Sequence, residues 1–515
     1  MGLVKKLELS ANPFEHYAAE TEPNISEYAI RPPYLSSIID RSSALNSFTL
    51  FGDRGAGKSA TRITVFNALW QAVYDGQDSE ICPLAVNVTD FSMILDDFQK
   101  GELTDRKFVA LVAFHVLEKI LAWLSSLDNE DREIYIEGLD PEERSLAVAL
   151  LEEFYLSVPE MDRNVSNSDA LRLLNSAWTT KSQVWMNARW AAISKIFAAA
   201  LGALSRKQID ADIDITEAAE SILISLKPDT GKAAVAILNK LVELSQAFGF
   251  SGVCVLVDKV DETNVTANSA EATARLVHPI YNHIQLLEIN GISWVFFLWS
   301  DVQDYFSGKI PVRLDKISHA NITWTDLALR QMIETRLEFF SDRRINFSGM
   351  LADGALADEL FSHLASMALK SPRELIKILD IIIREHDIKS SGELLSPESV
   401  NDGLDAYCRE TIYSWFPERY LNQILRLGRA SFVNKDVQTK FKIGHQGARN
   451  KINGWEEVGL VAQDGTLPSE HGGKPVNRYV IRDPRVSRII ERRLFGIVGS
   501  DIEEEAVDAS DIVTE

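Results

Sequence analysis

The residues best suited to chemistry are a glycine-rich run that ends in a lysine and a serine. Its positions match the spacing G-x-x-x-x-G-K-S, and they are Gly52, Asp53, Arg54, Gly55, Ala56, Gly57, Lys58 and Ser59. Glycine allows positive φ angles, so such a loop can turn its backbone N–H groups inward as an anion nest. The lysine adds a charge for the β- and γ-phosphates, and the serine hydroxyl can bind Mg²⁺. A tight turn would explain the glycines but not the Lys-Ser pair, so the run predicts a phosphate-binding loop for ATP, with Ala60 continuing into the helix behind it.

A second group of polar residues follows an apolar run at 252–257. Asp258 comes directly after this run, and Asp261 and Glu262 come three and four positions later. Consecutive apolar residues predict a strand buried on both faces, whose carboxyl end reaches the sheet edge where ligands bind. We expect Asp258 to hold Mg²⁺ through its water shell, opposite Ser59, and Asp261 or Glu262 to polarise the attacking water.

A third apolar run, at 292–299, ends in Ser300 and Asp301. A polar residue at that strand end can reach the γ-phosphate or its water, which makes both residues candidate sensors. Either one could equally cap the next turn.

The elements that must position these residues alternate between strands and helices. Apolar runs predict strands at 82–88, 252–257, 292–299 and 320–324, and three- and four-residue spacing predicts helices at 60–74, 270–287 and 326–340. This order is typical of an α/β fold with a parallel sheet. Lys58 and Asp258 lie 200 positions apart, and the chain between them reads as a large helical insertion, with helices predicted at 108–124, 142–156 and 184–204. Its acidic stretches are either solvated surface or a partner-binding face.

With these motifs in hand, the chain resembles the AAA+/STAND branch of P-loop ATPases. The acidic motif resembles the STAND form, and the remainder resembles origin-recognition-type AAA+ ATPases and their prokaryotic relatives, over residues 10–90 and 245–390. The resemblance implies that Arg373, in the run 370–377, reaches the γ-phosphate from a helical lid, although Ser-Pro also simply begins helices. It implies an arginine finger at Arg313, with Arg336, Arg343 and Arg344 as competitors that could equally form surface ion pairs. Lys259 departs from the common pattern, which places a glutamate directly after the strand aspartate.

The N-terminal segment 9–35 contains several prolines and predicts an extended arm. Phe14, Tyr28 or Tyr34 could hold an adenine ring there, or could pin the arm to the core.

The C-terminal third predicts three helices, at 417–427, 434–441 and 446–458, followed by two short strands at 460–463 and 476–481. This order is that of a winged helix-turn-helix. Residues 419–493 hold fifteen Lys or Arg against seven Asp or Glu, whereas the whole chain has a net charge of −22. Nucleic-acid phosphates are one partner for such a face, and the candidate contacts are Gln446, Arg449, Asn450, Lys451, Lys474 and Arg478. The alternative is that this domain packs on the acidic ATPase body or docks a protein.

Composition sets the remaining expectations. An apolar share of 46% in 515 residues is that of an ordinary globular protein with several domains. Three cysteines without CxxC spacing read as buried thiols in a reducing compartment. The N-terminus has no long apolar stretch, and polar residues interrupt the apolar run 108–124, so we expect no membrane segment and a cytoplasmic protein.

Together these readings divide the chain into six parts. They are an N-terminal arm (1–45), an ATPase core (46–95 and 245–325), an all-helical insertion (96–244), a helical lid (326–410), a winged-helix domain (411–497) and a disordered acidic tail (498–515).

Two functions are compatible with this organisation. The first is an ATP- and Mg²⁺-dependent molecular switch, a homo-oligomer that acts on a companion effector protein; the resemblance extends to bacterial ATPases in antiphage defence. The second is a DNA-binding ATPase that acts as a replication or repair loader. A nucleotide-binding scaffold that barely hydrolyses ATP is a third, weaker alternative.

Overall fold

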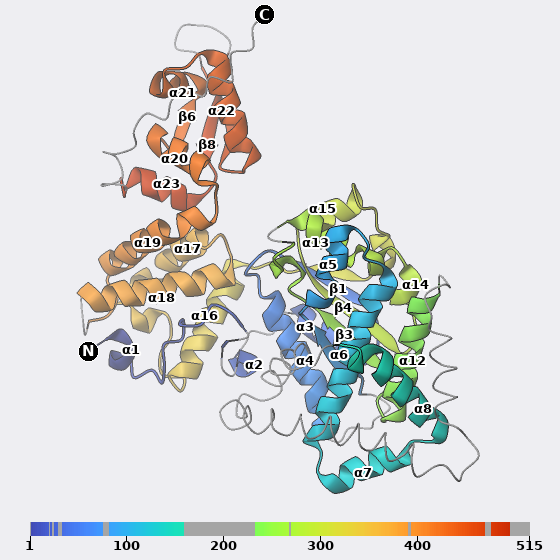
Figure 1. Ribbon diagram of the computed structural model, residues 1–515. Helices are drawn as coiled ribbons and strands as arrows, with labels where there is room; N and C mark the ends of the chain where they lie inside the picture. The colour runs from blue at the N-terminus through green and yellow to red at the C-terminus, as the bar shows by residue number, and fades with distance from the viewer. Residues whose placement is uncertain are drawn as a thin grey trace, which may run out of the picture. The chain divides into compact units, whose positions relative to one another are not determined.

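The computed structural model describes residues 2–19, 21–22, 25–28, 33–75, 82–158, 232–266, 269–389, 393–468 and 475–494 (Figure 1). The helix predicted at 184–204 and the tail predicted at 498–515 lie outside these residues. The chain divides into two compact units. One unit is Ala18–Trp324, and we name it the ATPase unit after the sequence prediction. The other combines Met1–Tyr17 with Thr325–Glu515, and we name it the lid unit in the same way.

The ATPase unit is built on a five-stranded parallel sheet in the order β2-β3-β4-β1-β5. The strands are β1 (Phe48–Gly52), β2 (Leu84–Val88), β3 (Val253–Val257), β4 (Ile292–Trp299) and β5 (His319–Asn321). Every residue of β1 and β3 is buried, as expected for strands covered on both faces. This is the strand order of AAA+ ATPases, and it confirms the predicted α/β fold.

Helices follow the strands on the chain and cover the sheet. They are α4 (Lys58–Tyr74), α5 (Ser92–Lys100), α6 (Asp105–Ser126), α12 (Ala233–Ala247), α13 (Ala270–Tyr281), α14 (Ile284–Leu287) and α15 (Val302–Ser307). The helix predicted at 270–287 is therefore two helices, because Pro279 removes an amide donor from the last turn of α13. The insertion adds α7 (Asn129–Gly138), α8 (Pro141–Leu150) and a π-helical turn at Leu151–Leu156, so its described part is helical.

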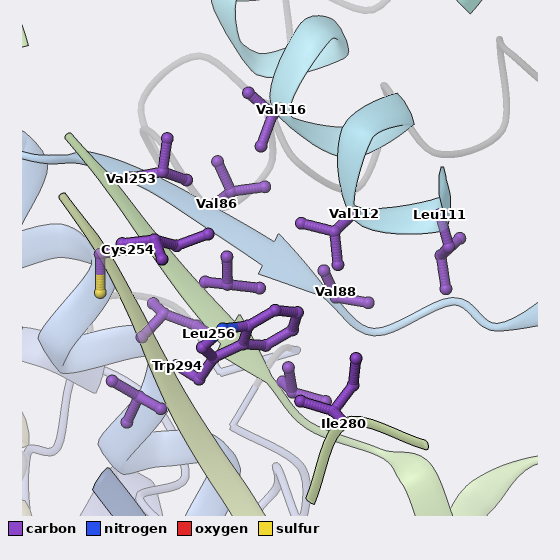
Figure 2. Close-up of a cluster of buried hydrophobic side chains, with 14 of the residues drawn as sticks. Val86, Val88, Leu111, Val112, Val116, Val253, Cys254, Leu256, Ile280 and Trp294 are labelled. Carbon is purple, nitrogen blue, oxygen red and sulfur yellow. The ribbon is translucent and has the colours of Figure 1, made fainter. Parts of the chain in front are cut away.

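The core of this unit forms where α6 lies on the sheet. Figure 2 shows Val112 and Val116 of α6 beside Val86 of β2, above Leu256 of β3 and the large ring of Trp294. Helix α6 is long and apolar enough to span a membrane, but 89% of its most apolar window is buried inside the structure. Its apolar character is therefore that of a core helix.

The predicted extended arm is wrong in part, because the chain forms α1 (Leu3–Lys6), α2 (Ile25–Tyr28) and α3 (Pro33–Ser43). Pro33 opens α3, where its missing N–H is no loss. Phe14 is fully buried within the lid unit, and Tyr28 is 3% exposed with its hydroxyl bonded to Glu22. Both rings therefore pack in the protein interior, which agrees with the alternative that these aromatic residues pin the arm to the core.

From Thr325 on, the lid unit continues with α16 (Asp326–Phe340), α17 (Ala357–Met367), α18 (Pro372–Lys389) and α19 (Pro397–Thr411). Figure 1 shows α18 and α19 side by side, and their packing buries apolar stripes such as Leu375, Leu379 and Ile382. Short 3₁₀ turns lie at Val260–Glu262, Leu314–Lys316, Ser348–Met350, Gly354–Leu356 and Ile412–Ser414 of the chain.

The winged helix-turn-helix follows, in the order α20 (Glu418–Leu427), β6 (Ser431–Val433), α21 (Asn434–Phe441), α22 (His445–Glu457), β7 (Val461–Leu467) and β8 (Val476–Ile481). Its sheet has the order β6-β8-β7. The predicted three helices and hairpin are confirmed, whereas β6 and α23 (Pro484–Glu491) were not predicted. Strand β6 is only three residues long, too short for an alternating pattern to reveal it.

Helix α23 ties the winged domain to the lid helices. Arg488 donates from Nε to Asp405 of α19 at 2.7 Å and from Nη2 to the carbonyl of Asn401 at 3.0 Å. Arg492 bonds to the other oxygen of Asp405 at 2.9 Å. Because Arg488 and Asp405 are both buried, these charge-assisted bonds fix α23 to α19.

One buried charge in α6 leads to a stability prediction. Lys119 is 4% exposed, and its Nζ lies 4.2 Å from the ring centre of Trp70 and 4.9 Å from that of Phe66. Burial lowers the pKa of Lys119 from 10.5 to about 7, against the attraction of Glu118, which raises it. Nζ has no hydrogen-bond partner among the described residues.

We expect Lys119→Met to raise the free energy of unfolding at neutral pH by about 1–2 kcal/mol, because a thioether of similar length replaces a buried ammonium that has no hydrogen-bond partner among the described residues. The wild-type chain should gain stability as pH rises from about 7 towards 10.5, since the unfolded lysine keeps a proton there that the folded one has lost. Urea unfolding at about pH 7 and about pH 9.5 checks both points. The methionine variant should lack the gain in unfolding free energy with pH that Lys119 contributes.

Candidate nucleotide-binding site

The predicted phosphate loop connects β1 to α4. Gly55 and Gly57 have φ angles of 75° and 93°, in the left-handed region that favours glycine. Gly57 is the N-cap of α4, a 17-residue helix, and no side chain caps its first N–H groups. Those donors lie at the positive end of the helix dipole. A phosphate is the ligand that such an end accepts most readily.

Lys58 lies across the loop that it belongs to. Its Nζ donates to the carbonyl of Gly52 at 2.8 Å and to the carbonyl of Asp53 at 3.2 Å. The side chain is 9% exposed. The cation is therefore held beside the uncapped helix end, where a bound phosphate would meet it.

Asp258, at the end of β3, lies in a buried network that the sequence did not predict. Arg62, one turn after Lys58 on α4, donates from Nε to Asp258 Oδ2 at 3.0 Å and from Nη1 to Asn87 Oδ1 at 3.0 Å. Arg62 is 1% exposed and Asp258 is 2% exposed. A carboxylate and an arginine this deeply buried stabilise each other only as a pair. The signal for Arg62 was its position one helical turn after the lysine, on the face of α4 that the sheet covers.

The two candidate water-polarising acids differ in their surroundings. Asp261 is 7% exposed, and its Oδ2 lies 3.4 Å from Nε of Arg54 in the loop. The Arg54 guanidinium also stacks on Trp299 at the end of β4, with Cζ 4.6 Å from the ring centre. Glu262 is exposed. The structure therefore places Asp261 against the predicted phosphate loop, through Arg54.

The ends of β4 and β5 complete the surroundings of the loop. The Ser300 N–H donates to the carbonyl of Gly52 at 3.3 Å. Asp301 has its pKa raised by burial and by the nearby Asp53 and Asp304 carboxylates. Trp324, three residues after β5, donates from Nε1 to the carbonyl of Ala56 at 2.8 Å. Sequence reasoning missed Trp299 and Trp324, whose apolar runs gave no sign of a contact with the loop.

The structure gives the local contacts of the arginines that the resemblance singled out. Arg313 is exposed and pairs with Asp315 of its own turn at 2.8 Å. Arg336 is 4% exposed and donates to the carbonyl of Pro13, so burial removes it as a competing finger. Arg344 forms an exposed ion pair with Glu8. Arg373 is the second residue of α18 in the lid unit, and its role stays a prediction.

The donor set fits a nucleotide with its magnesium better than a metal held by the protein alone. Among the described residues, no three His, Cys, Asp or Glu side chains gather into a metal site. Mg²⁺ usually takes only one or two protein ligands and completes its shell with phosphates and water. Ser59 beside the uncapped helix end and the buried carboxylate of Asp258 are suited to that arrangement.

The strand order and the loop define the class: an α/β P-loop fold of the AAA+ type, with a helical lid and a C-terminal winged helix-turn-helix. No protein-family model matches the sequence, and no curated protein matches it.

Three solved structures illustrate what the fold is similar to. The Aeropyrum pernix ORC1 protein in complex with DNA matches with a TM-score of 0.37 at 11% identity, over 93% of this chain and 94% of that one. The Aeropyrum pernix ORC2 protein with ADPNP and ADP matches with a TM-score of 0.40 at 12% identity, over 94% and 98%. Cdc6p from Pyrobaculum aerophilum matches with a TM-score of 0.33 at 10% identity, over 92% and 99%. Because these TM-scores are low, the fold assignment depends on the strand order and the loop of this chain.

Proposed function

We propose that the chain binds ATP with Mg²⁺ and hydrolyses it to ADP and phosphate, as a molecular switch. The observation that carries this proposal is the uncapped start of α4 beside Lys58, together with two acids from far along the chain. Asp258 bonds to Arg62 of the same helix, and Asp261 pairs with Arg54 of the loop. An isolated anion site would need the helix end alone. Acids beside it add what hydrolysis needs, a place for the metal and a group for the water.

Each residue has a part in this scheme. The loop amides and Lys58 hold the β- and γ-phosphates in place. Ser59 and Asp258 would hold Mg²⁺, which neutralises charge that develops on the phosphate oxygens. Asp261 orients the attacking water and accepts its hydrogen bond, while Ser300 supports the loop through Gly52. Arg373 from the lid and Arg313 from a neighbouring copy in a homo-oligomer are the proposed cations for the γ-phosphate.

Two matched substitutions test which acid serves the water. We expect Asp261→Asn to slow single-turnover hydrolysis about a hundredfold or more, the usual contribution of a positioned general base. Glu262→Gln should slow it much less, because Glu262 is exposed. Equal, small effects of both substitutions would contradict the assignment and favour a scaffold that barely hydrolyses.

In this switch, the change in nucleotide state would be transmitted by the lid unit. Since Arg488 and Arg492 fix α23 to Asp405 of α19, a movement of the lid helices carries the winged domain with it. A cytoplasmic location, a companion effector protein and a part in antiphage defence remain predictions from composition and resemblance.

A second candidate function is nucleic-acid binding through the winged domain, as in a replication or repair loader. Lys451 of α22 and Arg426 of α20 lie over the ring of Phe441, with Nζ and Cζ 5.1 and 5.6 Å from its centre. Burial, Arg419 and Arg426 lower the pKa of Lys451. Among the described residues, none of these three cations has an acidic partner within ion-pair distance, whereas Arg478 of the wing pairs with Asp464. Like charges gathered without a counter-charge favour an anionic partner.

Arg449 and Asn450 of the same helix, α22, are exposed as well. We expect Arg426→Gln, Arg449→Gln and Lys451→Gln together to weaken duplex DNA binding about tenfold or more and to reduce its salt dependence by roughly one unit of slope per lost phosphate contact. Lys389→Gln, an exposed lid residue paired with Asp402, is the control. If both variants bind duplex equally over a salt series, the face serves a protein or the chain itself.

A further inference from the structure

The side chain of Arg54 joins the phosphate loop to the ends of two neighbouring strands. Its guanidinium stacks on Trp299, the last residue of β4, and pairs with Asp261, which follows β3. The Arg54 side chain is 32% exposed and that of Asp261 is 9% exposed. The arginine therefore covers the very carboxylate that we assign to the attacking water.

The guanidinium of Arg54 is only weakly bonded by the groups around it. The closest approach to Asp261 is a single N–O distance of 3.4 Å, and the buried Nε forms no hydrogen bond with any described residue. Arg62, on the neighbouring helix, is bonded at 3.0 Å on both Nε and Nη1. Partly exposed ion pairs contribute little to stability, and a buried donor without an acceptor is unfavourable. Arg54 would thus gain from an anion that it can grip with both of its edges.

We propose that Arg54 recognises the γ-phosphate and so lets the chain distinguish ATP from ADP; this inference rests on the proposed ATPase function. A terminal phosphate offers three oxygens and more charge than one carboxylate, and the planar guanidinium binds such groups in a bidentate manner. Arg54 belongs to the loop that holds the phosphates, so it needs no neighbouring subunit to reach them. Transfer of the guanidinium to the phosphate releases Asp261 to hydrogen-bond the water.

In this proposal the γ-phosphate and the Asp261 carboxylate compete for the Arg54 guanidinium, and this competition can be tested. If Arg54 only anchored the loop, its removal would weaken ATP and ADP binding alike. If Asp261 and the γ-phosphate share the guanidinium, removing the carboxylate should strengthen binding of the triphosphate alone. The two substitutions therefore have opposite expected signs.

The test is calorimetric titration of the full-length chain with Mg²⁺ and either a non-hydrolysable ATP analogue or ADP. We expect Arg54→Gln to weaken analogue binding about tenfold or more while ADP binding changes less than about twofold, the size of one lost charge-assisted contact. Asp261→Asn should tighten analogue binding about threefold or more and leave ADP unchanged. In the Arg54→Gln background, Asp261→Asn should add nothing. Arg275→Gln, which removes an exposed ion pair with Glu271 in the same unit, should change neither.

A second measurement, the fluorescence of Trp299, leaves the sequence of the phosphate loop unchanged. The emission of Trp299, taken as the difference between the wild-type chain and Trp299→Phe, should change when the analogue binds and stay unchanged with ADP, because only the former draws Arg54 from the ring. Equal losses for both nucleotides in Arg54→Gln, or an unchanged Trp299 signal with the analogue, would overturn the inference alone. A wild-type chain that binds neither nucleotide would overturn the proposed function with it.

Discussion

Lys58→Ala should abolish ATP binding or turnover while the ATPase unit stays folded. The side chain supplies a cation beside the uncapped start of α4, and the loop holds it in place through the carbonyls of Gly52 and Asp53. Removing a preorganised donor of this kind lowers turnover about a hundredfold to a thousandfold. The loop conformation depends on Gly55 and Gly57, whose φ angles do not need the lysine.

The measurement is ATP binding and turnover, with circular dichroism to confirm the fold. Lys240→Ala is the matched control, because Lys240 lies in the same unit and pairs with the exposed Glu243. Turnover in Lys58→Ala within a few fold of the wild-type value would contradict the assignment of this loop.

Arg62→Met should destabilise the ATPase unit by about 3–5 kcal/mol, the usual result of removing one partner of a buried ion pair. The substitution leaves Asp258, 2% exposed, without the guanidinium that it bonds at 3.0 Å. It also removes the donor to Asn87. Urea unfolding followed by hydrogen exchange in peptides from β3 and α4 measures the loss where it arises.

Adding Asp258→Asn separates the effect of the buried charge from the effect of the lost Arg62 packing. In Arg62→Met with Asp258→Asn, at least half of the lost stability should return, because the buried charge is gone. Arg275→Met, at an exposed ion pair, should change stability by less than about 0.5 kcal/mol. A loss below about 1 kcal/mol in Arg62→Met would mean that water or another group already compensates Asp258.

Elements with a strong local pattern were predictable in place and length. Strand β4 and helices α16 and α21 begin and end where the sequence predicted, because apolar periodicity and the cap at Thr325 are local signals. The thiols of Cys82, Cys254 and Cys408 are buried and free, as predicted. The arm was predicted as extended because its prolines suggested breaks in helical structure. However, Pro33 begins α3, because proline is favourable at the first position of a helix.

The sequence by itself determined the phosphate loop, the acidic motif after β3 and the α/β alternation, since each depends on neighbours along the chain. Only the tertiary structure decided what these residues touch. The parallel sheet places β4 between β3 and β1, with β5 on the other side of β1. This order brings Asp261 and Trp299 to Arg54, Arg62 to Asp258, and Trp324 to Ala56. These contacts join positions far apart in sequence, and no local propensity encodes them, because they depend on which strand ends share one edge of the sheet.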